Sequence, residues 1–206
     1  MIPVKVLAVR YLPNAAPALL AGLGIPADTP SLGLLTTDCD DATFIALDEG
    51  TKAAEAVVGY SRSFYAGAPN ATTPNAGEVL GILAAATPGA VRSAMEAALG
   101  TLGRVGFRDL GGIPCLAHTV SSCGSFLARE AGVRPGAPLA YLIAPPLESM
   151  YALDASLKAA EVTLCKLYAP PTETNFGGAL LTGTQSACQI ACQAFAEAVG
   201  QLTIDS

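Results

Sequence analysis

The densest group of ionisable side chains in the sequence is an acidic turn, TTDCDD, at residues 36–41. Carboxylates this close together repel one another unless hydrogen-bond donors or a cation lie between them. Two interpretations are open: aspartates that accept backbone N–H groups in a turn or at a helix start, or a site for a cation such as an ammonium group. A calcium loop is not indicated, because the glycine and the distal glutamate of such a loop are missing at the required spacing.

Other residues with potential chemistry give weaker signals. Glu78 begins an apolar run after a glycine, where it is either a charge at a strand edge or one wall of a binding site. The single histidine, His118, lies in an expected strand, a setting more typical of a structural hydrogen bond than of a base. Neither a nucleophile motif nor a phosphate-binding glycine loop is recognisable. The sequence therefore predicts no catalytic residue and no cofactor.

The six cysteines form no C-x-x-C pair. Cys188 and Cys192 are four residues apart, which places both on one face of a helix, where thiols serve as small apolar core side chains. A zinc site would need two further ligands, and the chain holds one histidine. We therefore expect neither disulfides nor a metal site.

The composition narrows the class of protein. Hydrophobic residues make up 51 % of the chain and charged residues only 14 %, against about 25 % charged residues in an ordinary soluble protein. The apolar excess is spread over small residues and forms no stretch long enough to cross a bilayer. We expect some of it to be buried between subunits. With a net charge of −6 and no basic cluster, nucleic acid is not expected as a partner. The start of the chain runs directly into a strand pattern, so no secretory signal is expected and the predicted location is cytosolic.

A repeat sets the architecture that positions these residues. The segment 46–55 reads ALDEGTKAAE and the segment 152–161 reads ALDASLKAAE, with seven of ten positions identical at an offset of 106. In each copy, an aspartate suits the start of a helix and a lysine four residues later offers an ion pair, Asp48 with Lys52 and Asp154 with Lys158. Both copies are therefore predicted to be amphipathic helices.

The flanking segments also match between the halves. Apolar strand candidates precede each helix, at 32–35 and 139–143, and further strands follow. A helix should then start at Pro88 with Thr87 as its N-cap, and its counterpart should have Ser186 as the cap and carry Ile190, Cys192, Phe195 and Val199. Each half reads β-α-β-α-β-β-α. We expect an α/β (α+β) protein of two similar domains, residues 1–106 and 107–206, each with a mostly antiparallel sheet and flanking helices.

The string D-x-x-x-K-A-A in each half, followed by strands, resembles the bacterial microcompartment shell domain. The segments SLGLLTTDCDDATFIALDE, YAGAPNATTPNAGEVLGIL, LAYLIAPPLESMYALDASLKAAEV and PPTETNFGGALLTGTQSAC are similar to those of the EutL family, whose tandem domains are circularly permuted. The resemblance covers nearly the whole chain. It implies a structural shell protein of the ethanolamine-utilisation type, located in a microcompartment in the cytoplasm, and not an enzyme.

The resemblance also implies an assembly and a site. The assembly is a homotrimer that forms a pseudohexameric ring, contacts other shell proteins, and passes small metabolites such as ethanolamine through a gated central pore. The ligand-binding residues carried over from the family are Asp40, Glu78, Phe107 and Thr182, expected to line one pocket. Two carboxylates would neutralise the ammonium group, the ring would offer a face, and the threonine would bond the substrate hydroxyl.

Two turn-rich, nearly uncharged loops, residues 66–76 and 169–177, are either plain surface loops or, by the resemblance, the loops that open and close the pore. The pore-loop residues carried over are Ala66, Gly67, Pro69, Asn70, Asn75, Pro171, Glu173, Asn175 and Phe176. Two other functions stay open at this point: a free regulatory protein that binds small amines, and a shell protein of a related choline- or propanediol-type microcompartment.

Overall fold

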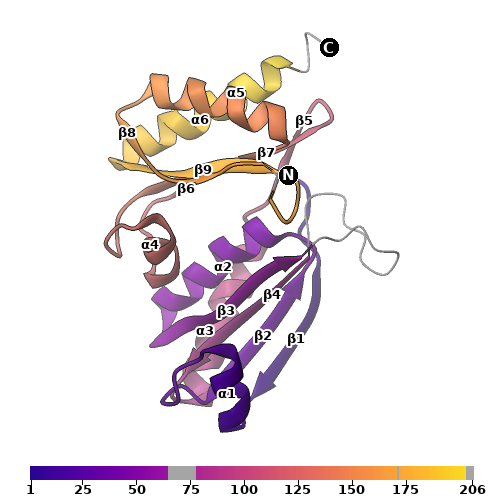
Figure 1. Ribbon diagram of the computed structural model, residues 1–206, viewed down its shortest axis with the longest axis vertical. Helices are drawn as coiled ribbons and strands as arrows, with labels where there is room; N and C mark the ends of the chain where they lie inside the picture. Colours follow the sequence, from indigo (N-terminus) through magenta and orange to yellow (C-terminus); the bar gives the residue numbers. More distant parts are fainter. Residues whose placement is uncertain (65–77, 171, 203–206) are drawn as a thin grey trace. The chain divides into compact units, whose positions relative to one another are not determined.

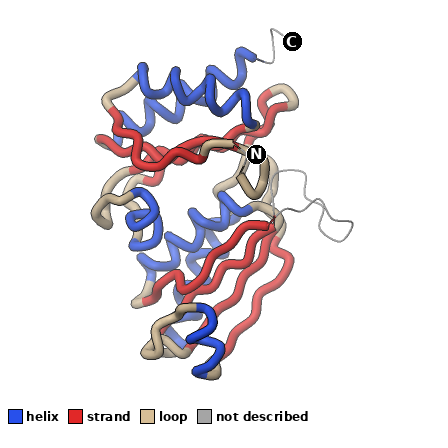
Figure 2. The backbone as a smooth tube through the Cα atoms, viewed as in Figure 1, coloured by secondary structure: helices blue, strands red, loops and turns tan. Residues whose placement is uncertain are grey.

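The computed structural model describes residues 1–64, 78–170 and 172–202. Its chain divides into two compact units (Figures 1 and 2). The N-terminal unit comprises Val4–Val105 and Gly124–Leu127, and the C-terminal unit comprises Met1–Pro3, Gly106–Cys123 and Ala128–Ser206. The division at 105/106 is close to the expected boundary of 106/107. Two short segments depart from it, since residues 1–3 and 124–127 each belong to the unit of the other half.

In the N-terminal unit, four antiparallel strands form a sheet in the order β1-β2-β4-β3. The elements are β1 Val6–Leu12, α1 Pro17–Leu23, β2 Ser31–Thr37, α2 Asp40–Ala53, β3 Ala56–Phe64, β4 Glu78–Ala85 and α3 Pro88–Leu102. Helices α2 and α3 pack on one face, where Gly81 and Gly33 leave room for Leu47 and Met95. Helix α1 covers the other face through Leu20 (Figure 1).

In the C-terminal unit, five antiparallel strands form a sheet in the order β5-β6-β7-β9-β8. The elements are β5 Arg108–Leu110, β6 Ile113–Val120, α4 Ser125–Ala131, β7 Leu139–Ala144, α5 Pro146–Ala159, β8 Val162–Tyr168, β9 Gly177–Gly183 and α6 Gln185–Leu202. Helices α5 and α6 lie side by side across one face of the sheet (Figure 1). Their buried faces meet small strand residues in the core.

Both units have the order β-α-β-α-β-β-α predicted from the sequence, and β5 is an addition to the second. The corresponding strands also occupy corresponding places in the two sheets. The predicted start of α3 is confirmed, because the Thr87 hydroxyl accepts the N–H of Ala90 at 3.2 Å. The two repeat helices are confirmed as helices, and both end earlier than the motif does, at Ala53 and Ala159, where the backbone turns extended.

Two local predictions need correction. Helix α6 begins at Gln185, and its cap is Thr184, whose hydroxyl accepts the N–H of Ala187 at 3.1 Å; Ser186 lies inside the helix. The helix carries Ile190, Cys192, Phe195 and Val199 as predicted, with Ile190 exposed and the other three buried. Lys52 binds Glu49, because the carboxylate of Asp48 accepts backbone N–H groups instead.

Candidate functional site

The acidic turn lies where β2 ends and α2 begins. Asp40 and Asp41 are the first two residues of α2, and both are buried. One carboxylate oxygen of Asp40 accepts the N–H of Asp41 at 2.9 Å, and Asp38 accepts the N–H of Lys5 at 2.7 Å. Carboxylates at this position are stabilised by the positive end of the helix. Bonds to backbone N–H groups thus account for part of the cluster.

Buried hydroxyl groups form hydrogen bonds on both sides of this turn. The hydroxyls of Thr37 and Thr43 are 2.7 Å apart, and Thr43 donates to the carbonyl of Cys39 at 2.9 Å. Burial raises the pKa of the Cys39 thiol well above its usual value, and the nearby aspartate charges, that of Asp41 first, act in the same direction. The thiol therefore stays protonated.

Glu78 lies at the same end of this sheet as the acidic turn. It is the first residue of β4, is half-buried, and pairs in register with Phe64 of β3. Its neighbour Val79 pairs with Thr37, the last residue of β2, after which the chain enters the turn. The N-terminal unit therefore brings Asp40 and Glu78 to the same end of its sheet.

Phe107 belongs to the C-terminal unit and is fully buried. Its ring meets that of Phe176 edge-on, with centroids 5.6 Å apart and planes at 73°. Its carbonyl accepts the N–H of Ile2 at 2.6 Å. Because the residue is only 1 % exposed, its ring offers no free face to a ligand in this structure.

Thr182 also belongs to the C-terminal unit, on β9, and its hydroxyl donates to the carbonyl of Pro138 at 2.8 Å. In register it is level with Leu139 and, through it, with Val120 at the end of β6. Arg108, which follows Phe107, pairs with Cys115 near the start of β6. Along β6, the five residue steps from Cys115 to Val120 span about 16 Å. The structure does not bring Phe107 and Thr182 together, and ethanolamine is too small to reach both.

The predicted pore-loop residues fall partly outside the described part of the chain. Ala66, Gly67, Pro69, Asn70, Asn75 and Pro171 lie outside the described residues, and Glu173, Asn175 and Phe176 lie within them.

In the described part of the second loop, the hydroxyl of Thr172 donates to the carbonyl of Phe176 at 2.7 Å, and the N–H of Asn175 bonds the carbonyl of Thr172 at 3.1 Å. Asn175 adopts a left-handed conformation, with φ of 61°. These bonds close residues 172–176 into a turn.

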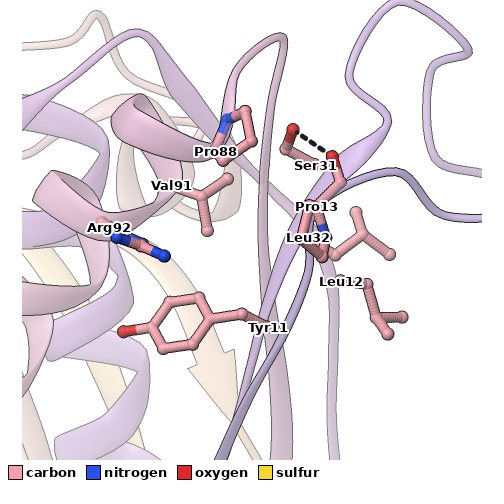
Figure 3. Close-up of a pocket in the computed structure, with 8 residues that line it drawn as sticks. All are labelled: Tyr11, Leu12, Pro13, Ser31, Leu32, Pro88, Val91 and Arg92. Atoms are coloured by element: carbon pink, nitrogen blue, oxygen red, sulfur yellow. Dashed lines mark hydrogen bonds between the residues drawn. The ribbon is translucent and has the colours of Figure 1, made fainter.

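A small cavity in the N-terminal unit lies between the edge of the sheet and the start of α3 (Figure 3). Its lining includes Tyr11, Leu32, Val91 and Arg92, and its volume is about 20 Å³. Such a space holds about one water molecule. An open groove of about 470 Å³ in the C-terminal unit lies between Arg108 of β5 and Glu197 of α6. Neither contains a residue of the predicted site.

One buried carboxylate with a defined role was missed by the sequence analysis. Asp48 accepts the N–H of Gly124 at 2.6 Å and that of Leu127 at 2.8 Å, and Thr51 accepts the N–H of Ser125 at 3.1 Å. Asp48 and Thr51 thus cap the start of α4. The available signal was weak: α4 has no capping side chain of its own in the sequence before it, where Gly124 stands.

The remaining candidates have structural surroundings. All six cysteines are thiols within the described residues; five are buried, and Cys165 is half-buried. Cys188 and Cys192 pack in the core of the C-terminal unit as predicted. Across the part of the chain that the structure describes, no group of three His, Cys, Asp or Glu side chains is arranged to hold a metal ion. Among the same residues, no helix combines the length and hydrophobicity of a membrane span.

Comparison with known proteins gives close relatives. A bacterial microcompartment shell protein EutL of Clostridium perfringens is 55 % identical over 199 residues, which covers 95 % of this chain and 92 % of that protein. The EutL shell protein of Salmonella typhimurium is 43 % identical over 95 % of this chain and 91 % of its own. No family model matches the sequence.

Solved structures agree with these relatives. The crystal structure of the ethanolamine utilisation protein EutL from Leptotrichia buccalis superposes with a TM-score of 0.93 at 51 % identity, over 99 % of this chain and 96 % of that one. A trimeric microcompartment shell protein, PduB, shares the fold, with a TM-score of 0.81 at 21 % identity over 94 % of this chain and 87 % of its own. With relatives this similar over almost its entire length, the chain belongs to the EutL family of bacterial microcompartment shell proteins.

Proposed function

We propose that this chain is a structural shell protein of an ethanolamine-type microcompartment, which assembles as a homotrimer and tiles with other shell proteins. The observation that carries the proposal is its identity of 43–55 %, over 95 % of its length, with proteins named as EutL shell proteins. Relatives of other names, PduB and EtuB, are 20–21 % identical. This difference favours the ethanolamine type over a choline or propanediol type.

The repeat supports a ring of three chains. Each chain carries two domains with the same element order and the same strand order, so three chains supply six similar domains. A closed ring of this kind buries equivalent interfaces and leaves no open edge. The low charge content, 14 %, leaves apolar surface available for those interfaces.

Light scattering and electron microscopy test the assembly. Light scattering at micromolar concentration should give about three times the chain mass of 20.7 kDa, and concentrated samples should form flat sheets visible by electron microscopy. A monodisperse monomer would contradict the shell function. A trimer that forms no sheets, alone or with other shell proteins, would favour the alternative of a free amine-binding regulatory protein.

The same proposal includes a pore and an amine site. The turn at 172–176 borders the pore through which small metabolites pass, and Glu173 supplies a charge at its rim. A primary amine binds between Asp40 and Glu78, at the end of the N-terminal sheet where both carboxylates lie. What supports the site is the pair of carboxylates at one end of the sheet and the family resemblance of the segments that carry them. Thr182, at the far end of its own sheet, is not part of the proposed site.

A further inference from the structure

Two short helices of the chain are repeat counterparts. Helices α1 and α4 both have seven residues, and each ends at a glycine in the left-handed conformation, Gly24 with φ of 69° and Gly132 with φ of 66°. The next residues, Ile25 and Val133, donate to the carbonyls of Leu20 and Ala128, five residues back in both cases. The shared hydrogen bonds fix an offset of 108 residues, which aligns residues 16–24 with residues 124–132.

The start of α4 is docked on α2 within the N-terminal unit. The contact consists of the bonds from Gly124 and Leu127 to Asp48, the bond from Ser125 to Thr51, and a tilted ring pair between Phe126 and Phe44 at 6.0 Å. Through this contact the side chain of Leu127 is fully buried, as is Ile45 on α2.

The counterpart of α2 in the second half, α5, has the corresponding face uncovered. At the offset of 106, the positions of Asp41, Ile45 and Thr51 are taken by Leu147, Tyr151 and Leu157. Their exposed fractions are 68 %, 54 % and 37 %, which is high for large apolar side chains that share one face of a helix. We call Leu147, Tyr151, Asp154 and Leu157 the α5 face.

The counterpart of the docked segment, at the start of α1, is also uncovered. Leu19 stands at the position of Leu127 and is 43 % exposed, although its neighbour Leu20 is buried against its own sheet. The chain therefore has an exposed copy of a docking segment and an exposed copy of the face that receives such a segment.

The residues of the two exposed copies are complementary to each other. In the docked pair, the N–H of Ser125 donates to the hydroxyl of Thr51. In the exposed pair, Pro17 has no N–H and Leu157 has no acceptor, so donor and acceptor have been lost together and replaced by an apolar contact. Replacing both partners is close to neutral, whereas losing one would leave a polar group without its bond. This matched change indicates that Pro17 and Leu157 face each other.

Charge and hydrogen bonding agree with that pairing. Asp154 stands at the position of Asp48 and, in the single chain, makes only an exposed ion pair with Lys158 at 2.6 Å. Helix α1 has no side-chain cap. The Asp154 carboxylate can therefore accept the N–H group at residue 16 as Asp48 accepts that of Gly124, while the N–H of Leu19 bonds the carbonyl of Ala16 at 2.9 Å.

We propose that the α5 face is the docking surface for the start of α1 of a second copy of this chain. The proposal rests on the homotrimer of the proposed function and assigns the contact between its subunits. The docking is not an identical copy of the internal one. A Cβ at Gly124 would lie 2.3 Å from the Thr51 hydroxyl and 2.6 Å from the Asp48 carbonyl. Because Ala16 has a Cβ at that position, α1 lies further from α5 than α4 does from α2.

A disulfide cross-link tests the contact directly. A Cβ at Gly124 would lie 2.3 Å from the Thr51 hydroxyl, so in the proposed contact residues 16 and 157 face each other. The outward shift of α1 brings their Cβ atoms to the roughly 4 Å that a disulfide needs. The double variant Ala16→Cys with Leu157→Cys should, on mild oxidation, give covalent dimers and trimers on a non-reducing gel. The matched control pairs Ala16→Cys with Leu164→Cys, an equally exposed leucine on β8, and should remain monomeric on the gel. Each single cysteine variant reports any contribution of Cys165.

A double-mutant cycle tests the chemistry of the contact. Pro17→Ser alone and Leu157→Thr alone should each raise the concentration at which the trimer dissociates by about tenfold, because each places a polar group against an apolar partner. The double variant restores, at positions 17 and 157, a counterpart of the Ser125–Thr51 bond and should return to within about threefold of the wild type.

The outcomes separate the two proposals. A monomeric wild type overturns the proposed function. A wild-type trimer whose 16/157 variant cross-links within one chain, or does not cross-link, overturns this contact and leaves the shell function in place. Additive effects in the double variant also count against the contact.

Discussion

Asp48 and Asp154 occupy the same position in two copies of one ten-residue motif, yet their surroundings differ completely. Asp48 is fully buried and caps α4, whereas the Asp154 side chain is exposed and pairs with Lys158. Burial raises the pKa of Asp48 above its ordinary value of 3.8, against the lowering effect of the Leu127 and Gly124 N–H groups. The cap therefore holds a carboxylate whose charge is costly to bury.

This gives a prediction for stability against pH. With its pKa raised, folded Asp48 binds a proton more readily than unfolded Asp48 does, so its contribution to the free energy of unfolding falls as pH rises from about 4 through the folded pKa. Asp48→Asn keeps one acceptor oxygen and removes the titration. Urea unfolding of wild type and variant, measured across pH 4 to 8, should show the wild type losing stability relative to the variant.

The control for this titration is Glu96→Gln, which removes an exposed carboxylate on α3 and should leave the pH dependence unchanged. Asp48→Ala, which leaves two buried N–H groups without acceptors, should cost about 2–4 kcal/mol near pH 4 and less at higher pH, where the wild type has lost part of the contribution of Asp48. A wild type that gains stability relative to Asp48→Asn with rising pH would contradict the argument.

The proposed amine site gives a second prediction at this scale. A ligand with four heavy atoms binds with at best about −6 kcal/mol, at a ceiling near ~1.5 kcal/mol per atom, so the Kd for ethanolamine should be tens of micromolar or weaker. Calorimetry on Asp40→Asn and on Glu78→Gln should show binding weakened about tenfold or more. Thr182→Val should bind like the wild type, since Thr182 lies at the far end of its sheet. Equal binding in all three variants would remove the site and leave the shell assignment intact.

Some residue roles could be predicted from the sequence, and others could not. Thr87 and Pro88 predict a helix start, because the cap bond joins Thr87 to Ala90, only three residues later. The role of Asp48 depends on Gly124, which is 76 positions away in the sequence. Local sequence patterns carry no information about contacts over such a separation. Thr182 was assigned by similarity of a segment, and only strand register places it far from Phe107.

At the scale of elements, the repeat made the fold predictable. Periodicity and turn residues gave both helices of the motif and the strands around them, because a half-buried helix or strand shows its buried face in its own sequence. The exchange of residues 124–127 into the N-terminal unit was not predictable in this way. It depends on which buried N–H groups find acceptors, and these pairs form only in the folded chain.

A substitution at Gly124 tests how residues 124–127 dock in the N-terminal unit. A Cβ there would meet the Thr51 hydroxyl at 2.3 Å and the Asp48 carbonyl at 2.6 Å, distances that require α4 to move from its cap. Gly124→Ala should therefore destabilise the protein by about 1–3 kcal/mol, as overpacking does. Gly89→Ala is the matched control, because nothing lies within 4 Å of the added carbon. Equal denaturant midpoints for the two variants would show that α4 tolerates the shift.

At the scale of the whole molecule, charge and apolar surface act against each other. Each chain carries a net charge of −6, so a trimer carries three times −6, or −18. Repulsion between such particles opposes tiling, while the apolar residues that make up half of the chain favour association.

Salt changes this balance in a predictable direction. Raising the ionic strength from 0.01 to 0.1 M shortens the screening length from about 30 to about 10 Å, which weakens repulsion between trimers and leaves apolar contacts unaffected. Sheets seen by electron microscopy, and turbidity at fixed protein concentration, should therefore increase with salt, while the trimer mass from light scattering stays constant. Sheets that dissolve as salt is added would mean that ion pairs, and not apolar contacts, join one trimer to the next.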